Sequence, residues 1–151
     1  MKISPDARGF FLAWLIFYVP GLVFSVVAAL AKMSPPESPG LALDVVPLTV
    51  LAIVVFPALE TFFLVACTTV TMHLFGFGWL AAFAGAVPIS LLHFGEGGLV
   101  KVGIVLWAFV WSAFCYLRMT VDQRPFRTKY TFLFGLHALG NALAVAAAKL
   151  T

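Results

Sequence analysis

Residues 45–75 read VVPLTVLAIVVFPALETFFLVACTTVTMHLF. Apart from Glu60, this stretch contains no Asp, Glu, Lys or Arg, and most of its side chains are apolar. An apolar run longer than about 20 residues is typical of a helix that crosses a lipid bilayer. Pro47 and Pro57 favour a kink, a tilt or an extension beyond the bilayer. The stretch therefore predicts a transmembrane helix with a carboxylate near its middle.

The composition of the whole chain also indicates a membrane protein. Of the 151 residues, 63% are hydrophobic and 10% are charged, and the mean hydropathy is +1.09. In a soluble domain, about half of the residues are apolar and about a quarter are charged. The length is that of one domain and supplies about five spans of roughly 20 residues. We therefore expect an all-α membrane protein with a bundle of about five transmembrane helices.

Four further apolar runs supply the other expected helices, at residues 9–31, 79–94, 99–119 and 130–150. The first is longer than the apolar core of a signal peptide, about 7–15 residues, so we expect a retained helix that is kinked at Pro20. We divide the chain into an N-terminal anchor helix with a polar loop, residues 1–44, and a core, residues 45–151.

Turn-forming residues separate these runs. Residues 32–40 are rich in proline and predict a loop outside the membrane, and residues 76–78 predict a tight turn. Pro88 is expected to interrupt the third helix, which carries His93 at its end, and the glycine-rich residues 95–98 are expected to break it. Residues 120–129 predict a basic loop.

The charges predict an orientation and exclude one class of partner. The nine Lys and Arg lie almost entirely in predicted loops and at helix ends, which is typical of topology control and not of nucleic-acid binding. With the N-terminus inside, the inner segments hold Lys2, Arg8, Arg118, Arg124, Arg127 and Lys129, and the outer ones hold Lys32, Lys101 and Lys149. This bias predicts an inside N-terminus and an outside C-terminus, with lipid as a partner. The small size and short loops suggest a bacterial inner membrane.

The predicted spans carry Glu60, His93, His137 and Asn141 inside the apolar layer. Ionisable side chains within a bilayer are costly and by default indicate function. At a rise of about 1.5 Å per residue, Glu60 and His93 lie at matching depth on antiparallel helices. His137 and Asn141 are four residues apart and share one helix face. We therefore expect the four side chains to form one site.

These residue types suit hydrolysis. A carboxylate accepts a proton from water, and a histidine shares that task. The N–H groups of histidine and asparagine stabilise an oxyanion. Glu60 and His93 are thus the predicted water-activating pair, and His137 and Asn141 the predicted polarising pair. The alternative is that all four only hydrogen-bond between helices.

Three ordered motifs carry a resemblance to a known family. They are Phe56-Pro57-Ala58-Leu59-Glu60-Thr61-Phe62-Phe63, Ser90-Leu91-Leu92-His93 and His137-Ala138-Leu139-Gly140-Asn141. Over residues 45–148 the sequence resembles the CPBP intramembrane proteases, which include CAAX-processing and bacteriocin-processing endopeptidases. The resemblance implies a CPBP-like four-helix core and a glutamate-type, metal-independent peptidase without a cofactor. Its substrate would be a peptide or protein with a membrane-associated segment or a C-terminal tail.

The sequence departs from this family's first motif, a Glu-Glu pair with an arginine four residues after the second Glu. Thr61 stands in place of the second Glu, and Val65 in place of the arginine. Ile89 also replaces a phenylalanine that is frequent four residues before the histidine. A second hypothesis is therefore a non-catalytic pseudoprotease that acts as a binding or assembly subunit.

A third hypothesis is a metal site, because one carboxylate and two histidines resemble an open zinc site. The chain has no HExxH motif and no second carboxylate beside Glu60, which argues against it. Cys67 and Cys115 lie in apolar runs without a CxxC or Cys/His spacing, so we expect two small buried side chains.

Overall fold

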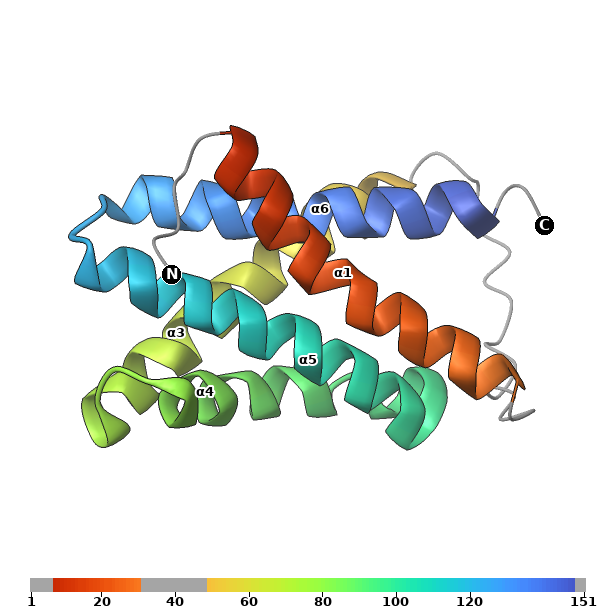
Figure 1. The fold of residues 1–151 in the computed structure, drawn as a ribbon, viewed down its shortest axis with the longest axis horizontal. Helices are drawn as coiled ribbons and strands as arrows, with labels where there is room; N and C mark the ends of the chain where they lie inside the picture. The colour runs from red at the N-terminus through yellow and green to blue at the C-terminus, as the bar shows by residue number, and fades with distance from the viewer. Residues whose placement is uncertain (1–6, 31–48, 149–151) are drawn as a thin grey trace.

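The computed structural model describes residues 7–30 and 49–148, and over these ranges the chain contains helices and no strands. The elements are α1 (Ala7–Leu30), the short π-helix η1 (Leu51–Val55), α3 (Phe56–Phe75), α4 (Trp79–Leu91), α5 (Phe94–Val121) and α6 (Phe126–Ala148). In Figure 1, α5 runs between α4 and α6, and α1 crosses in front of α6 and then runs alongside α5. The predicted all-α class is confirmed for the described part of the chain.

Two stretches of the described helices are long and apolar enough to cross a membrane, Leu51–Phe75 and Lys101–Val121. Gly9–Val19 and Trp79–Leu91 are apolar but shorter. The first of the long stretches joins η1 to α3 and corresponds to the quoted run around Glu60. The number of spans therefore stays a prediction.

The junction between α4 and α5 differs from the prediction. His93 does not lie on the third helix, because α4 ends at Leu91 and α5 already begins at Phe94. The N–H of His93 donates to the carbonyl of Ser90 at 3.1 Å, which closes a turn. The glycine-rich residues 95–98 do not break a helix but lie at the start of α5. A glycine inside a helix costs only about 1 kcal/mol, and at Gly98 the φ of +62° suits a residue without a Cβ.

The prolines also interrupt less than expected. The helix α4 continues through Pro88 to Leu91, and α1 continues through Pro20. Pro57 lies in the first turn of α3, where a residue without an N–H is tolerated. The expected loop at residues 32–40, like Pro47, lies outside the described residues.

The predicted basic loop at residues 120–129 is much shorter in the structure. Only residues 122–125 separate α5 from α6, so Thr120 and Lys129 belong to helices. The N–H of Arg124 donates to the carbonyl of Met119 at 2.9 Å and closes this turn. The prediction is wrong here because charge alone does not distinguish a polar helix end from a turn.

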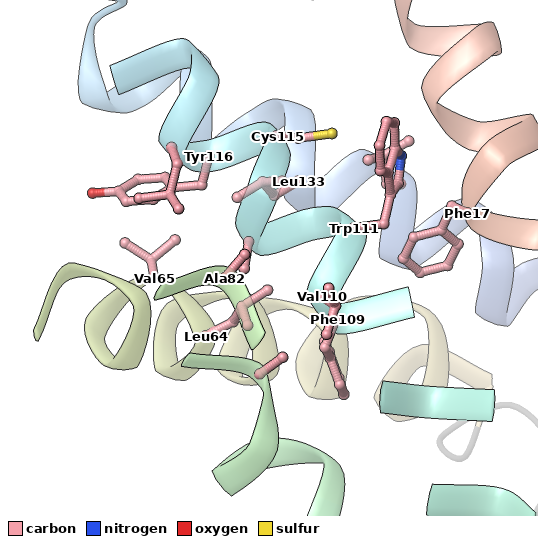
Figure 2. Packing of buried hydrophobic residues seen from close by; sticks show 14 of the residues in the cluster. Phe17, Leu64, Val65, Ala82, Phe109, Val110, Trp111, Cys115, Tyr116 and Leu133 are labelled. Carbon is pink, nitrogen blue, oxygen red and sulfur yellow. The ribbon is translucent and has the colours of Figure 1, made fainter. Parts of the chain in front are cut away.

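The helix α5 forms the centre of the core. Figure 2 shows its buried side chains, among them Phe109 and Trp111, surrounded by apolar residues of the other helices. The indole N–H groups of Trp107 and Trp111 donate to the carbonyls of Ile16 and Ala13 at 3.1 and 3.0 Å. These two bonds tie α1 to α5, so α1 packs as part of the bundle.

Small side chains bring α4 close to α3. The buried face of α4 carries Ala81, Ala82, Gly85 and Ala86. A Cβ added at Gly85 would lie 2.8 Å from the Cα of Thr68, which is closer than real Cβ atoms come to another backbone. Small residues permit such close approach of helix backbones, an arrangement frequent in membrane proteins.

We expect Gly85→Ala to lower the free energy of unfolding by about 1–3 kcal/mol, because the added methyl pushes α4 away from α3. The matched control is Gly103→Ala on the exposed side of α5, where a Cβ would meet nothing within 4 Å. That control is expected to be neutral or slightly stabilising. Thermal unfolding in detergent measures both, and equal midpoints for the two variants would contradict the close packing.

Candidate functional site

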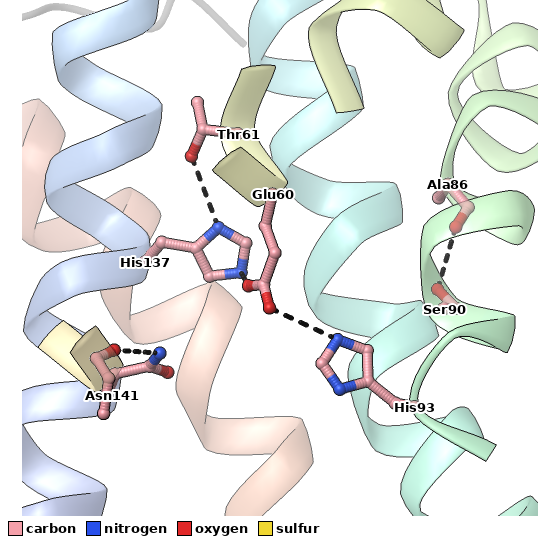
Figure 3. A network of polar contacts seen from close by, with 8 residues as sticks. Glu60, Thr61, Ala86, Ser90, His93, His137 and Asn141 are labelled. Carbon is pink, nitrogen blue, oxygen red and sulfur yellow. Dashed lines mark hydrogen bonds and ion pairs between the residues drawn. The ribbon is translucent and has the colours of Figure 1, made fainter. Parts of the chain in front are cut away.

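Three of the four predicted polar residues meet between the helices (Figure 3). Glu60 comes from α3, His93 from the turn between α4 and α5, and His137 from α6. Oε1 of Glu60 lies 3.7 Å from Nε2 of His93, and Oε2 lies 3.7 Å from Nε2 of His137. The carboxylate is therefore held between two imidazoles, with one oxygen facing each ring.

The cluster is partly shielded from solvent. The side chains of Glu60, His93 and His137 are 23%, 15% and 9% exposed. Both oxygen–nitrogen separations exceed a direct hydrogen bond of about 2.7–3.2 Å, so a small movement or a shared water would complete each contact. Partial shielding strengthens the electrostatic attraction between the groups, because less water screens them.

Glu60 lies at the border between the buried side and the exposed side of α3. Pro57 and Leu64 of α3 are buried against the bundle, whereas Leu59 and Phe63 are exposed. A residue on this border reaches inward with its carboxylate while part of its side chain stays accessible. This explains why Glu60 meets two histidines without being enclosed.

Aromatic rings hold the two histidines in place. The ring of Phe109 lies 4.7 Å from that of His137 and 6.0 Å from that of His93, between centroids. The ring of Phe17 on α1 lies 5.8 Å from that of His137. Sequence reasoning missed both phenylalanines, because nothing distinguishes them from the other aromatic residues of the chain.

The structure directs Asn141 away from the carboxylate. Its Nδ2 donates to the carbonyl of Ala52 in η1 at 2.8 Å, as Figure 3 shows. The four-residue spacing from His137 is present on α6, but the amide ties α6 to η1 and does not face Glu60. In η1 the N–H of Phe56 donates to the carbonyl of Leu51, five residues earlier, and the residue five after Ala52 is Pro57, which has no N–H to donate.

Thr61 enters the site instead. Its Oγ1 lies 3.5 Å from Nδ1 of His137, and the residue is fully buried. The sequence offered one signal for this contact, since Thr61 follows Glu60 and stands where the CPBP motif has a second Glu. Val65, at the position of the motif's arginine, is buried in the apolar core.

Metal ligation finds little support in the geometry. Within residues 7–30 and 49–148, no group of three or more His, Cys, Asp or Glu side chains is arranged to hold a metal ion. A zinc ion would need each ligand atom at about 2.0–2.2 Å. Here Nε2 of His93 and Nε2 of His137 lie next to different oxygens of Glu60, so they do not converge on one point.

The comparisons with known proteins assign no family to the chain. No protein-family model matches the chain, and neither a curated protein nor a solved structure matches it. The resemblance to the CPBP proteases stays a hypothesis on the motifs around Glu60, His93 and His137.

We expect Asn141→Ala to lower the free energy of unfolding by about 0.5–1.5 kcal/mol, because the Ala52 carbonyl loses its side-chain donor. The control is Thr131→Ala on the exposed side of α6, whose hydroxyl bonds only to its own helix. That change should stay within about 0.5 kcal/mol. Chemical or thermal unfolding in detergent compares them, and an Asn141 variant as stable as the control would speak against the tie.

Proposed function

We propose that the chain is an integral membrane protein with about five transmembrane helices. The support is the large number of exposed apolar side chains, which a soluble protein rarely gathers in one place. On η1 and α3, only 28% of the most apolar stretch is buried, whereas the core helix of a soluble protein is mostly buried. Phe62 and Leu74 are examples, at 62% and 70% exposed. Lipid acyl chains are the partner that covers such an apolar surface.

The proposed orientation has the N-terminus and the turn at residues 122–125 on the inner side of a bacterial inner membrane. Arg118, Arg124, Arg127 and Lys129 all lie at or near this end of α5 and α6. Basic residues at the ends of spans are retained inside. With an odd number of spans, the C-terminus lies outside.

Reporter fusions test this topology. Alkaline phosphatase joined after Thr151 is expected to be active, because it folds only outside the inner membrane, and a fusion after Gln123 is expected to be inactive. Green fluorescent protein at the same two positions serves as the control and should give the reverse pattern. The opposite result at both positions would overturn the orientation.

We further propose that the Glu60 cluster activates water in a glutamate-type intramembrane endopeptidase. The observation that carries this proposal is the carboxylate held between two imidazoles at 3.7 Å each, on segments far apart in the sequence. Glu60 accepts a proton from a water beside His93, and the resulting hydroxide adds to the carbonyl carbon of the scissile peptide bond. An N–H of His137 stabilises the oxyanion of the tetrahedral intermediate. The C–N bond then breaks as the proton held by Glu60 passes to the leaving amine, which leaves Glu60 ionised again.

The proposed substrate is a peptide or protein whose cleaved bond lies in or near a membrane-associated segment. Glu60 is reached from the border of α3, beside the exposed apolar residues Leu59 and Phe63. Moving an apolar segment from lipid onto this apolar surface would cost little free energy. No metal or cofactor is needed for the proposed steps.

A non-catalytic role as a binding or assembly subunit is the second candidate. The observation in its favour is the bond from Asn141 to Ala52, which leaves His137 as the one member of the predicted polarising pair that faces Glu60. Oxyanion stabilisation with one donor missing typically costs a factor of about 10²–10³ in rate.

Substitution of the cluster separates the two candidates. Glu60→Gln and His93→Gln are each expected to lower proteolysis at least about 100-fold, because proton transfer to and from water is lost. The control is His73→Gln, since His73 is exposed near the opposite end of α3. New peptide termini are quantified by mass spectrometry after the protein is co-reconstituted with membrane proteins of its source.

Unchanged cleavage in both cluster variants would refute the peptidase proposal. Wild-type protein that yields no new termini, but co-purifies with a partner in fixed ratio, would favour the second candidate.

A further inference from the structure

The hydroxyl of Thr61 behaves unlike the other helical hydroxyls that the structure describes with a hydrogen-bond partner. Thr69, Thr120 and Ser90 each donate to the carbonyl four residues earlier in their own helix, at 2.7–2.9 Å. Such bonds are usual for serine and threonine inside helices. In the described part of the chain, Thr61 makes no bond of this type, and its one polar contact is Nδ1 of His137 at 3.5 Å. Its hydroxyl therefore faces the site.

The two edges of the His137 ring face different chemistry. Nε2 lies 3.7 Å from a carboxylate oxygen of Glu60, and Nδ1 lies 3.5 Å from the Thr61 hydroxyl. An ionised carboxylate only accepts hydrogen bonds, whereas a hydroxyl both donates and accepts. A proton on Nε2 satisfies the carboxylate, and a bare Nδ1 then accepts the proton of Thr61. The reverse arrangement sets a nitrogen lone pair against the carboxylate.

The ring has no equally good second orientation. A flip by 180° places carbon atoms where Nδ1 and Nε2 now lie and removes both polar contacts. Phe109 and Phe17 pack against the ring, edge to face, and limit its movement. Thr61 is fully buried, so solvent does not replace its hydroxyl.

We propose that Thr61 is a positioning residue that holds neutral His137 with its proton on Nε2, directed toward Glu60. The geometry alone supports this tautomer. The importance of this tautomer for catalysis rests on the proposed function, in which His137 donates an N–H hydrogen bond to an oxyanion. Thr61 then does not mark a gap in the motif but supplies the group that orients the polarising histidine.

Nitrogen-15 spectra of histidine-labelled protein in lipid nanodiscs test the proposal. The chain has three histidines, and the signals of His137 are those lost in His137→Gln. In wild-type protein near neutral pH, Nδ1 is expected at the shift of an unprotonated nitrogen and Nε2 at that of a protonated one. A protonated Nδ1 overturns the proposal, whether or not the Thr61 variants fold.

Two substitutions test the role of the hydroxyl itself. Thr61→Ser keeps the hydroxyl donor and should leave the chemical shift of Nδ1 unchanged. Thr61→Val keeps the shape of the side chain but removes the donor, and it should move the shift of Nδ1 to that of an unprotonated nitrogen that accepts no hydrogen bond. An unchanged resonance in Thr61→Val overturns the proposal. Where turnover is measurable, Thr61→Val should lower kcat about five- to tenfold with little change in KM, and Thr61→Ser should restore it. If the peptidase proposal is wrong, substitution of Glu60 leaves the activity unchanged. The spectra determine the tautomer of His137 in either case.

Discussion

A carboxylate placed among apolar helices must find partners, and the arrangement around Glu60 follows from that constraint. An ionised group removed from water costs several kcal/mol unless nearby groups compensate it. Glu60 meets His93 and His137, each 3.7 Å from a different carboxylate oxygen. These contacts require α3, the α4–α5 turn and α6 to converge at one level. The candidate site is thus also a point at which three segments are held together.

The packing of the helices makes this convergence possible. The small residues on α4 let it approach the backbone of α3, and the end of α4 then delivers His93 to Glu60. The indole bonds of Trp107 and Trp111 fasten α1 to α5 from the other side. In this way Phe17 of α1 reaches the ring of His137. Side chains far from the carboxylate therefore set its surroundings.

The polar contacts divide into two groups with different consequences. In the first group, Glu60 contacts His93 and His137, and His137 contacts Thr61. Proton transfer and polarisation are the roles that we propose for this group. Asn141 bonds to Ala52 and joins α6 to η1. Asn141, which residue spacing predicts to belong to the site, thus makes a contact between helices. Thr61, which stands in place of the second Glu of the CPBP motif, contacts His137 in the site. Substitutions of the two are expected to separate stability from chemistry.

The sequence by itself determined the all-α class, the positions of most helices and the identity of three clustered residues. Apolar runs and costly polar residues are local properties of the chain, and they suffice for these predictions. Only the tertiary structure decided that α5 begins before the glycines, that His93 lies in a turn, and that Thr61 rather than Asn141 faces the cluster. The direction of a polar side chain depends on which helix packs beside it, and neither residue spacing nor matching depth contains that information.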